Sequence, residues 1–185
     1  WHTLTNNADN LSSDFVAENF DFYGKTLRGQ KANEARWKRC TSATEGAFTH
    51  PLGRKYVDKA FAGESKNIAL DLINRIEGAF EDNLPGLTWM DDTTRERAMA
   101  KVKAIHNKIG YPDKWRDYSG LGVTKGEHLS NILASNRFEH AYHANKIGKP
   151  VDRDEWRAGP PVVNASYSGT RNEMWFPAGI LQAPF

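Results

Sequence analysis

The sequence PPVVNASYSGTRNEMWFPAGILQAPF, residues 160–185, carries the clearest structural pattern in the chain. Apolar and β-branched residues stand on both sides of a glycine-containing turn at 168–170, a pattern typical of a β-hairpin. The second arm should stop at Pro177, because proline has no N–H to donate to a strand ladder. We therefore expect a hairpin with Asn164-Ala165 at the middle of its first arm, followed by an apolar segment too irregular for a strand.

The last six residues of the sequence include three large apolar side chains, those of Ile180, Leu181 and Phe185. A natural C-terminus is usually polar and frayed. We therefore expect the chain to be a piece of a longer protein.

Six helices are expected before the hairpin, because apolar residues recur there at intervals of three and four. The clearest follows Glu64, where an apolar stripe runs from Ile68 to Phe80 on one helix face. In the fifth helix, Thr93 and Glu96 fit a capping box, and the apolar spacing continues to Ile109. The expected ranges are 12–28, 33–47, 51–62, 64–84, 93–109 and 129–147. The fold class is therefore mainly α, with residues 1–157 helical and residues 158–185 beginning a second domain.

The composition excludes several classes of function. The formal net charge is only +2, from 25 basic and 23 acidic residues, and no basic stripe of the kind that nucleic-acid binding requires is present. No apolar run approaches the roughly 20 residues of a membrane span. The first residues do not have the charged and then apolar pattern of a signal peptide.

Several segments carry a resemblance to one protein family. They are VNA-x-Y and RNE-x-x-FPAGILQ-x-PF near the end, AFAGESK at 60–66, LTWMDD at 87–92, IGYPD at 109–113 and DEW at 154–156. Together they resemble the zinc metallopeptidase family of neprilysin and endothelin-converting enzyme. The resemblance implies that residues 1–157 are most of a helical domain that faces the catalytic domain across a cavity. Residues 158–185 would then be the first strands and a pocket segment of the catalytic domain, truncated before its zinc-binding HExxH helix.

Catalytic machinery is not expected within this chain. None of its six histidines stands in HExxH, and the nearest arrangement is Glu139, His140 and His143, which we interpret as a solvated helix face. A GxSxG nucleophile elbow is absent from the sequence. Pairs such as Asp91-Asp92 fit caps and turns better than acid–base chemistry. The ligands of the zinc ion implied by the resemblance are therefore expected beyond Phe185.

Substrate-contacting residues are expected around the hairpin. An exposed edge strand can pair with an extended peptide through its backbone. By resemblance, the Asn164 carboxamide holds the substrate main chain, Ala165 offers backbone contacts, and Ile180 and Phe185 line the pocket for the residue after the cleaved bond. The alternatives are an ordinary strand asparagine and plain core packing. Relatives usually have Phe or Tyr where this chain has Ser166, which should widen or polarise the pocket before the cleaved bond.

Cys40 is the single cysteine, so it is either a buried free thiol or half of a bridge to another part of the protein. The segment around it resembles a family segment whose cysteine pairs with one further upstream. That pairing implies an oxidising compartment, and hence an extracellular or cell-surface protein. Asn10 is a candidate N-glycosylation site in the sequon Asn10-Leu11-Ser12, whereas the sequon at Asn164 should stay unused because a glycan would block the cleft.

These observations predict part of a neprilysin-like zinc metalloendopeptidase that hydrolyses small peptides. The expected partners are small peptide substrates and the remainder of the peptidase chain. The alternative is a non-catalytic, peptide-binding relative without zinc ligands. A helical interaction module with a hairpin is a third reading, but it leaves the matching segments unexplained.

Overall fold

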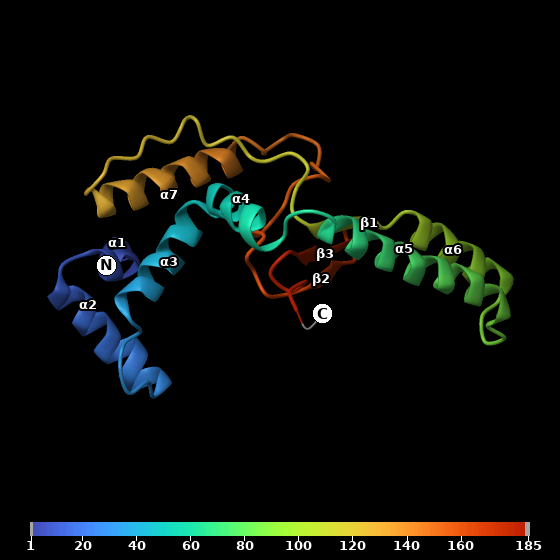
Figure 1. Ribbon diagram of the computed structural model, residues 1–185, viewed down its shortest axis with the longest axis horizontal. Helices are drawn as coiled ribbons and strands as arrows, with labels where there is room; N and C mark the ends of the chain where they lie inside the picture. The colour runs from blue at the N-terminus through green and yellow to red at the C-terminus, as the bar shows by residue number, and fades with distance from the viewer. Residues whose placement is uncertain (1, 184–185) are drawn as a thin grey trace. The chain divides into compact units, whose positions relative to one another are not determined.

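The computed structural model describes residues 2–183, which fall into two compact units (Figure 1). The first unit comprises residues up to 48 together with 117–150, and the second comprises 49–116 together with the chain from 151 onward. The expected mainly helical fold with a small sheet is confirmed. The expected domain boundary between residues 157 and 158 lies inside the second unit. It concerns the domains of the complete protein and stays a prediction.

The described part of the first unit contains helices and turns. Ser135 ties two of these helices together, because its buried Oγ donates a hydrogen bond of 2.7 Å to the Ala47 carbonyl. The expected first helix is confirmed, but its second half widens into a π-helix, η2. The elements are α1 His2–Asn7, η1 Ala8–Asn10, α2 Ser13–Asn19, η2 Phe20–Thr26, α3 Arg36–Ala47 and α7 His128–Ala144.

The second unit contains the remaining helices and the sheet. Its helical elements are α4 Thr49–Ala60, α5 Ser65–Asn83, the 3₁₀ turn η3 Leu84–Gly86 and α6 Asp92–Lys103. The expected helices at 51–62 and 64–84 are confirmed, with bounds that differ by a few residues. Proline and glycine in η3 end α5, because proline removes the N–H that would continue the helix.

Asp91 caps α6. Its carboxylate accepts the Thr94 N–H at 2.6 Å, and hydrogen bonds from Thr94 lower the pKa of Asp91 below its ordinary value. Thr93 lies inside the helix, so the expected capping box at Thr93 is wrong.

Within residues 2–183, three strands form one small sheet in the order β1-β3-β2. The hairpin is confirmed, with β2 at Ser166–Ser168 and β3 at Glu173–Pro177 running antiparallel. The remaining strand, β1 at His106–Gly110, pairs with β3 in parallel and lies beside α5 (Figure 1). The expected helix through Ile109 is therefore wrong at its end. The apolar spacing of residues 105 and 109 fits a helix, but pairing with a strand distant in sequence overrides this local pattern.

The core of the second unit lies where α4 meets the end of the sheet. Val57, Phe61 and Ala178 are buried together there. Partly buried side chains pack around them, those of Tyr56, Tyr111, Trp115 and Leu181. Gly110 has φ +75°, and a Cβ at this position would lie 2.6 Å from the Phe61 ring. Glycine is therefore required where β1 passes this core.

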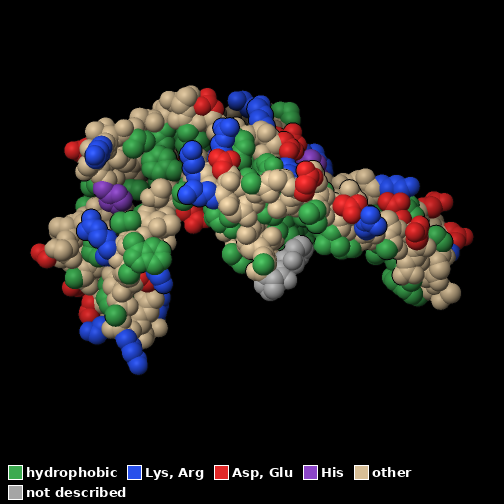
Figure 2. All heavy atoms as spheres, in the orientation of Figure 1, with side chains coloured by type: hydrophobic (Ala, Val, Ile, Leu, Met, Phe, Trp, Pro, Cys, Tyr) green, Lys and Arg blue, Asp and Glu red, His purple; other side chains and the backbone are tan. Residues whose placement is uncertain are grey.

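The apolar stripe of α5 is not part of this core. Ile68 is 67% exposed and Ile76 is 57% exposed, and Leu72 and Phe80 on the same face are also exposed. Hydrophobic side chains are visible at the surface in the region of α5 (Figure 2). The helix is amphipathic as its sequence predicts, but the described residues do not cover its apolar face.

Candidate functional site

Asn164 and Ala165 lie immediately before β2, outside the ladder. Continued pairing would place Asn164 opposite Pro177, which has no N–H to donate, so the ladder ends at Ser166. The expectation that these two residues lie at the middle of the first hairpin arm is therefore wrong. The exposed Asn164 side chain instead accepts the Ala165 N–H through its Oδ1, at 2.8 Å.

The edge of the sheet beside these residues is open. Among the described residues, β2 has β3 on one side and no strand on the other. Ser166 and Tyr167 are exposed. Unpaired backbone groups on such an edge can accept an extended peptide as an additional strand.

The turn after β3 is held against the segment that leads to Asn164. The Ala178 N–H donates to the Gly110 carbonyl at 2.8 Å, and the Gly179 N–H donates to the Pro160 carbonyl at 2.7 Å. Ile180 follows directly and is partly buried. The structure therefore brings the segment carrying Asn164 and the turn carrying Ile180 together through Gly179. Phe185 lies outside the described residues.

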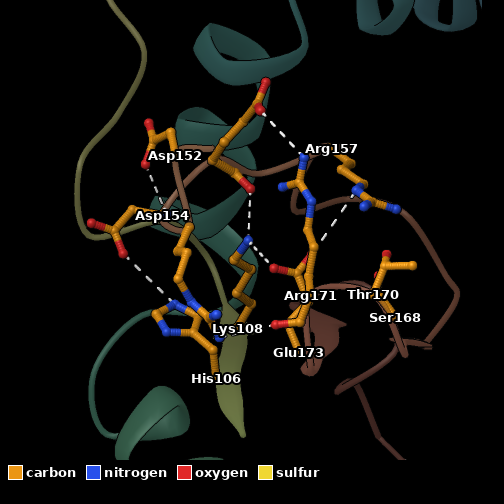
Figure 3. Close-up of polar contacts among 11 residues, drawn as sticks. His106, Lys108, Asp152, Asp154, Arg157, Ser168, Thr170, Arg171 and Glu173 are labelled. Atoms are coloured by element: carbon orange, nitrogen blue, oxygen red, sulfur yellow. Dashed lines mark hydrogen bonds and ion pairs between the residues drawn. The ribbon is translucent and has the colours of Figure 1, made fainter. Parts of the chain in front are cut away.

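A buried ion pair joins β1 to β3. Lys108 Nζ donates to Glu173 Oε2 at 2.8 Å and to the Glu155 carbonyl, also at 2.8 Å. The two side chains are only 3% and 5% exposed. Figure 3 shows Lys108 and Glu173 pointing toward each other across the sheet.

Residues 153–157 contribute further polar contacts around this pair (Figure 3). Two of the contacts reach β3 and β1. Arg157 Nε lies 3.9 Å from Glu173 Oε1 on β3, and Asp154 Oδ1 lies 3.7 Å from His106 Nε2 on β1. A third is the hydrogen bond from Arg153 Nη2 to the Arg171 carbonyl, 2.9 Å long. The segment 153–157 is therefore tied to one face of the sheet by groups of both charge signs.

Sequence reasoning missed the ion pair, because it assigned residues 106–109 to a helix. The sequence carries no strand signal there, because His106, Asn107 and Lys108 are three polar residues in a row and do not alternate with apolar ones. His106 and Lys108 can be placed on one face only once the strand itself is known.

The described residues do not form a metal site. Between residues 2 and 183, no group of three or more His, Cys, Asp or Glu side chains is arranged to hold a metal ion. His140 and His143 are exposed on α7, and His143 Nε2 lies 3.8 Å from Glu139 Oε2. This arrangement agrees with a solvated helix face.

Cys40 is exposed, so its interpretation as a buried thiol is wrong. Its bridge to an upstream cysteine stays a prediction. Asn10 is partly buried, and its Oδ1 lies 2.9 Å from His128 Nε2. Glycosylation of Asn10 also stays a prediction. In the part of the chain from 2 to 183, no helix combines the length and the apolar character that crossing a membrane requires.

Comparison with known families and proteins gives consistent matches. The pattern described as peptidase family M13 matches residues 1–112. Human neprilysin is 39% identical over an alignment of 193 positions, which covers 100% of this chain and 26% of neprilysin. Bovine endothelin-converting enzyme 1 is 38% identical, again over 100% of this chain and 26% of the relative. The chain therefore spans about a quarter of the length of these relatives.

Solved structures agree with the sequence matches. The zinc metalloprotease Zmp1 of Mycobacterium tuberculosis, in complex with an inhibitor, superposes with a TM-score of 0.88 at 38% identity. That match covers 100% of this chain and 28% of the Zmp1 chain. PepO from Lactobacillus rhamnosis superposes with a TM-score of 0.86 at 29% identity, covering 98% of this chain and 29% of PepO. The similarity therefore extends through both units of the chain.

Proposed function

This chain belongs to peptidase family M13, the family of neprilysin and endothelin-converting enzyme, and we propose that it supplies the substrate-aligning wall of a zinc metalloendopeptidase. The complete protein would hydrolyse peptide bonds in small peptides, because a helical domain facing the cleft excludes folded proteins. Its partners would be those peptides and the remainder of the peptidase chain.

The observation that carries this proposal is the open edge of β2 beside Asn164 and Ala165. An extended peptide can add to such an edge through main-chain hydrogen bonds, while pockets select its side chains. Asn164 is exposed and adjoins that edge, so its carboxamide is available to a peptide backbone.

Binding requires a rearrangement of Asn164. Its Oδ1 accepts the Ala165 N–H, and that N–H must be released before Ala165 can contact a substrate. Rotation of the carboxamide toward the peptide would free the Ala165 N–H at the same moment. Both residues would then contribute polar contacts to one stretch of substrate backbone.

The pocket for the residue after the cleaved bond would be lined by Ile180 and Phe185. Support for Ile180 comes from the hydrogen bond between Gly179 and Pro160, which holds this turn beside the substrate-binding segment. Ser166 is small, polar and exposed, so the pocket before the cleaved bond would be wider than in relatives with an aromatic ring there.

The zinc ion would be held by residues beyond Phe185. The side chains of residues 2–183 do not fit a zinc site, which needs about three protein ligands. We therefore assign to this chain the binding and alignment of substrate. The predicted bridge at Cys40 and the sequon at Asn10 fit an extracellular or cell-surface protein.

A substitution at Asn164 in the complete protein tests the proposal. Asn164→Ala should lower kcat/KM for small peptides roughly tenfold, about 1.4 kcal/mol, because one or two hydrogen bonds to the substrate are lost. Asn74→Ala on the exposed surface of α5 is the control and should leave kcat/KM unchanged. Equal activity of the Asn164 variant and wild type would contradict the assignment.

The non-catalytic alternative has its own outcome. A complete protein that binds small peptides with Asn164-dependent affinity, but does not cleave them with zinc present, would be a peptide-binding relative.

A further inference from the structure

The ion pair between Lys108 and Glu173 is the most deeply buried contact between charged side chains among the ion pairs of the described residues. Both partners have further polar neighbours: Lys108 Nζ has two oxygen acceptors at 2.8 Å, and Arg157 Nε lies 3.9 Å from the second carboxylate oxygen of Glu173. The pair connects β1 to β3, and its two residues lie 65 positions apart in the sequence.

Stability alone does not account for a pair in this position. Removing two charges from water costs free energy that their attraction only partly returns, and apolar residues of similar volume often replace such pairs without loss. Buried ionic groups can instead select one arrangement among several, since hydrogen bonds are directional and apolar contacts are not.

The arrangement that this pair can select is the register of β1 against β3. His106 lies opposite Glu173 and Lys108 lies opposite Trp175, so the pair joins diagonal neighbours on the same face. A slip of one residue would move Lys108 to the opposite face from Glu173 and leave both charges buried without partners. On the other face, Ile109 lies opposite Phe176, an apolar contact that discriminates between registers less strongly. Asn107 on that face donates to Glu77 at 2.9 Å, which ties β1 to α5 and not to β3.

The register in turn determines where the turn after β3 lies. Gly110 ends β1 opposite Pro177, and its carbonyl accepts the Ala178 N–H at 2.8 Å. The next residue, Gly179, donates to the Pro160 carbonyl. A different register would break the first hydrogen bond and displace the second, and Ile180 would move with them.

We infer that Lys108 and Glu173 are positioning residues, whose buried ion pair selects the β1–β3 register and thereby places the turn carrying Ile180. Residues 153–157 also hold the ion pair in place, because the Glu155 carbonyl is the second acceptor of Lys108. The register does not depend on the proposed function. Only its consequence for peptide cleavage rests on that proposal.

Amide hydrogen exchange in the complete protein tests the register directly. The variant Lys108→Met with Glu173→Leu removes both charges and keeps apolar bulk. We expect it to keep its helical circular dichroism, while the Ala178 and Gly179 amides exchange at least about tenfold faster. The matched control is Arg75→Met with Asp71→Leu, which replaces an exposed Arg–Asp pair on α5 with the same two apolar residues and should leave both amides unchanged.

A milder substitution provides a second test of the register. If the double variant does not fold, Glu173→Gln keeps a hydrogen-bond acceptor without the charge and should still raise exchange at Ala178. Wild-type exchange at Ala178 and Gly179 in the folded variant, double or single, would overturn the inference.

Peptide cleavage supplies the readout that a merely structural role would not change. In the folded variant, KM should rise several-fold for peptides with a large apolar residue after the cleaved bond, while kcat stays within about twofold. Equal changes for peptides with small and large residues there would contradict a role in placing Ile180. If the wild-type protein cleaves no peptide, the proposed function fails, and the exchange measurement still decides the register.

Discussion

Gly179 has no space for a side chain, because a Cβ at this position would overlap the Pro161 carbonyl oxygen. Its N–H also donates to the neighbouring Pro160 carbonyl at 2.7 Å. Gly179→Ala should therefore push the turn away from this segment and lower the free energy of unfolding by about 1–3 kcal/mol, the usual cost of overpacking. Thermal unfolding followed by circular dichroism measures the change.

Gly78 provides the control for this substitution. It lies within α5, and a Cβ there would meet nothing within 4 Å. Gly78→Ala should raise stability by about 0.5–1 kcal/mol, since alanine is the better helix former. A Gly179 variant as stable as wild type would show that the turn relaxes without cost.

For single residues, the sequence indicated which ones could cap a helix or lie near a substrate, but it did not identify their hydrogen-bond partners. Asp91, Asp92 and Thr93 are all good caps, and only the structure shows that Asp91 accepts the Thr94 N–H. Asn164 and Ala165 were predicted at the middle of the first hairpin arm, but they precede β2. Their position outside the ladder depends on Pro177 of the other arm, a pairing that appears only once the register is known.

Among the elements, α5 carries an apolar face that the described residues leave exposed. Leu72 and Ile76, one turn apart, are 41% and 57% exposed. Exposed apolar patches promote association. Leu72→Glu with Ile76→Glu should therefore weaken self-association of this chain about tenfold, as measured by sedimentation over a range of concentrations.

A charge control separates this effect from simple repulsion. Asn74→Glu with Asn67→Glu adds the same charge to the same helix at exposed polar positions, and should change self-association far less. If both double variants weaken association equally, the apolar face is not its cause.

The periodicity of α5 predicted the helix and its apolar stripe, because both are local properties of the sequence. It did not predict what covers the stripe.

The strand β1 shows more strongly that local sequence does not predict contacts with distant segments. Ile105 and Ile109 satisfy helical spacing, and the three consecutive polar residues between them do not show the alternation of a strand. Their structure is decided by β3, whose backbone groups pair with theirs from far along the chain. Long and periodic helices were therefore predictable from the sequence, whereas a short strand defined by a distant partner was not.

At the scale of the whole molecule, the two units interleave along the chain, which passes from one to the other near residues 48, 116 and 150. Only the last of these points coincides with a strong sequence signal, the Gly148-Lys149-Pro150 segment. The division into consecutive domains at residue 157 was predicted from the change from helix to strand. The two units are instead defined by contacts between segments distant in sequence, and such contacts leave no mark in composition.

Because each unit is held by its own internal contacts, a core substitution in one should leave the other intact. Ser135 is 1% exposed, and its Oγ donates to the Ala47 carbonyl within the first unit. Ser135→Ala should destabilise that unit by about 1–3 kcal/mol, because the buried carbonyl loses this donor. Amide exchange in α3 should then become faster, while exchange of the β1 amides in the second unit should stay at the wild-type rate.

Ser130→Ala is the matched control on the same helix, because Ser130 is exposed and should change exchange in neither unit. Faster exchange of α3 and β1 together in the Ser135 variant would mean that the chain opens as one cooperative body. Faster exchange of α3 alone would mean that the sheet carrying the candidate site keeps its structure when the helical unit opens. Loss of peptide binding in such a variant would then have to arise in the helices rather than at the edge of β2.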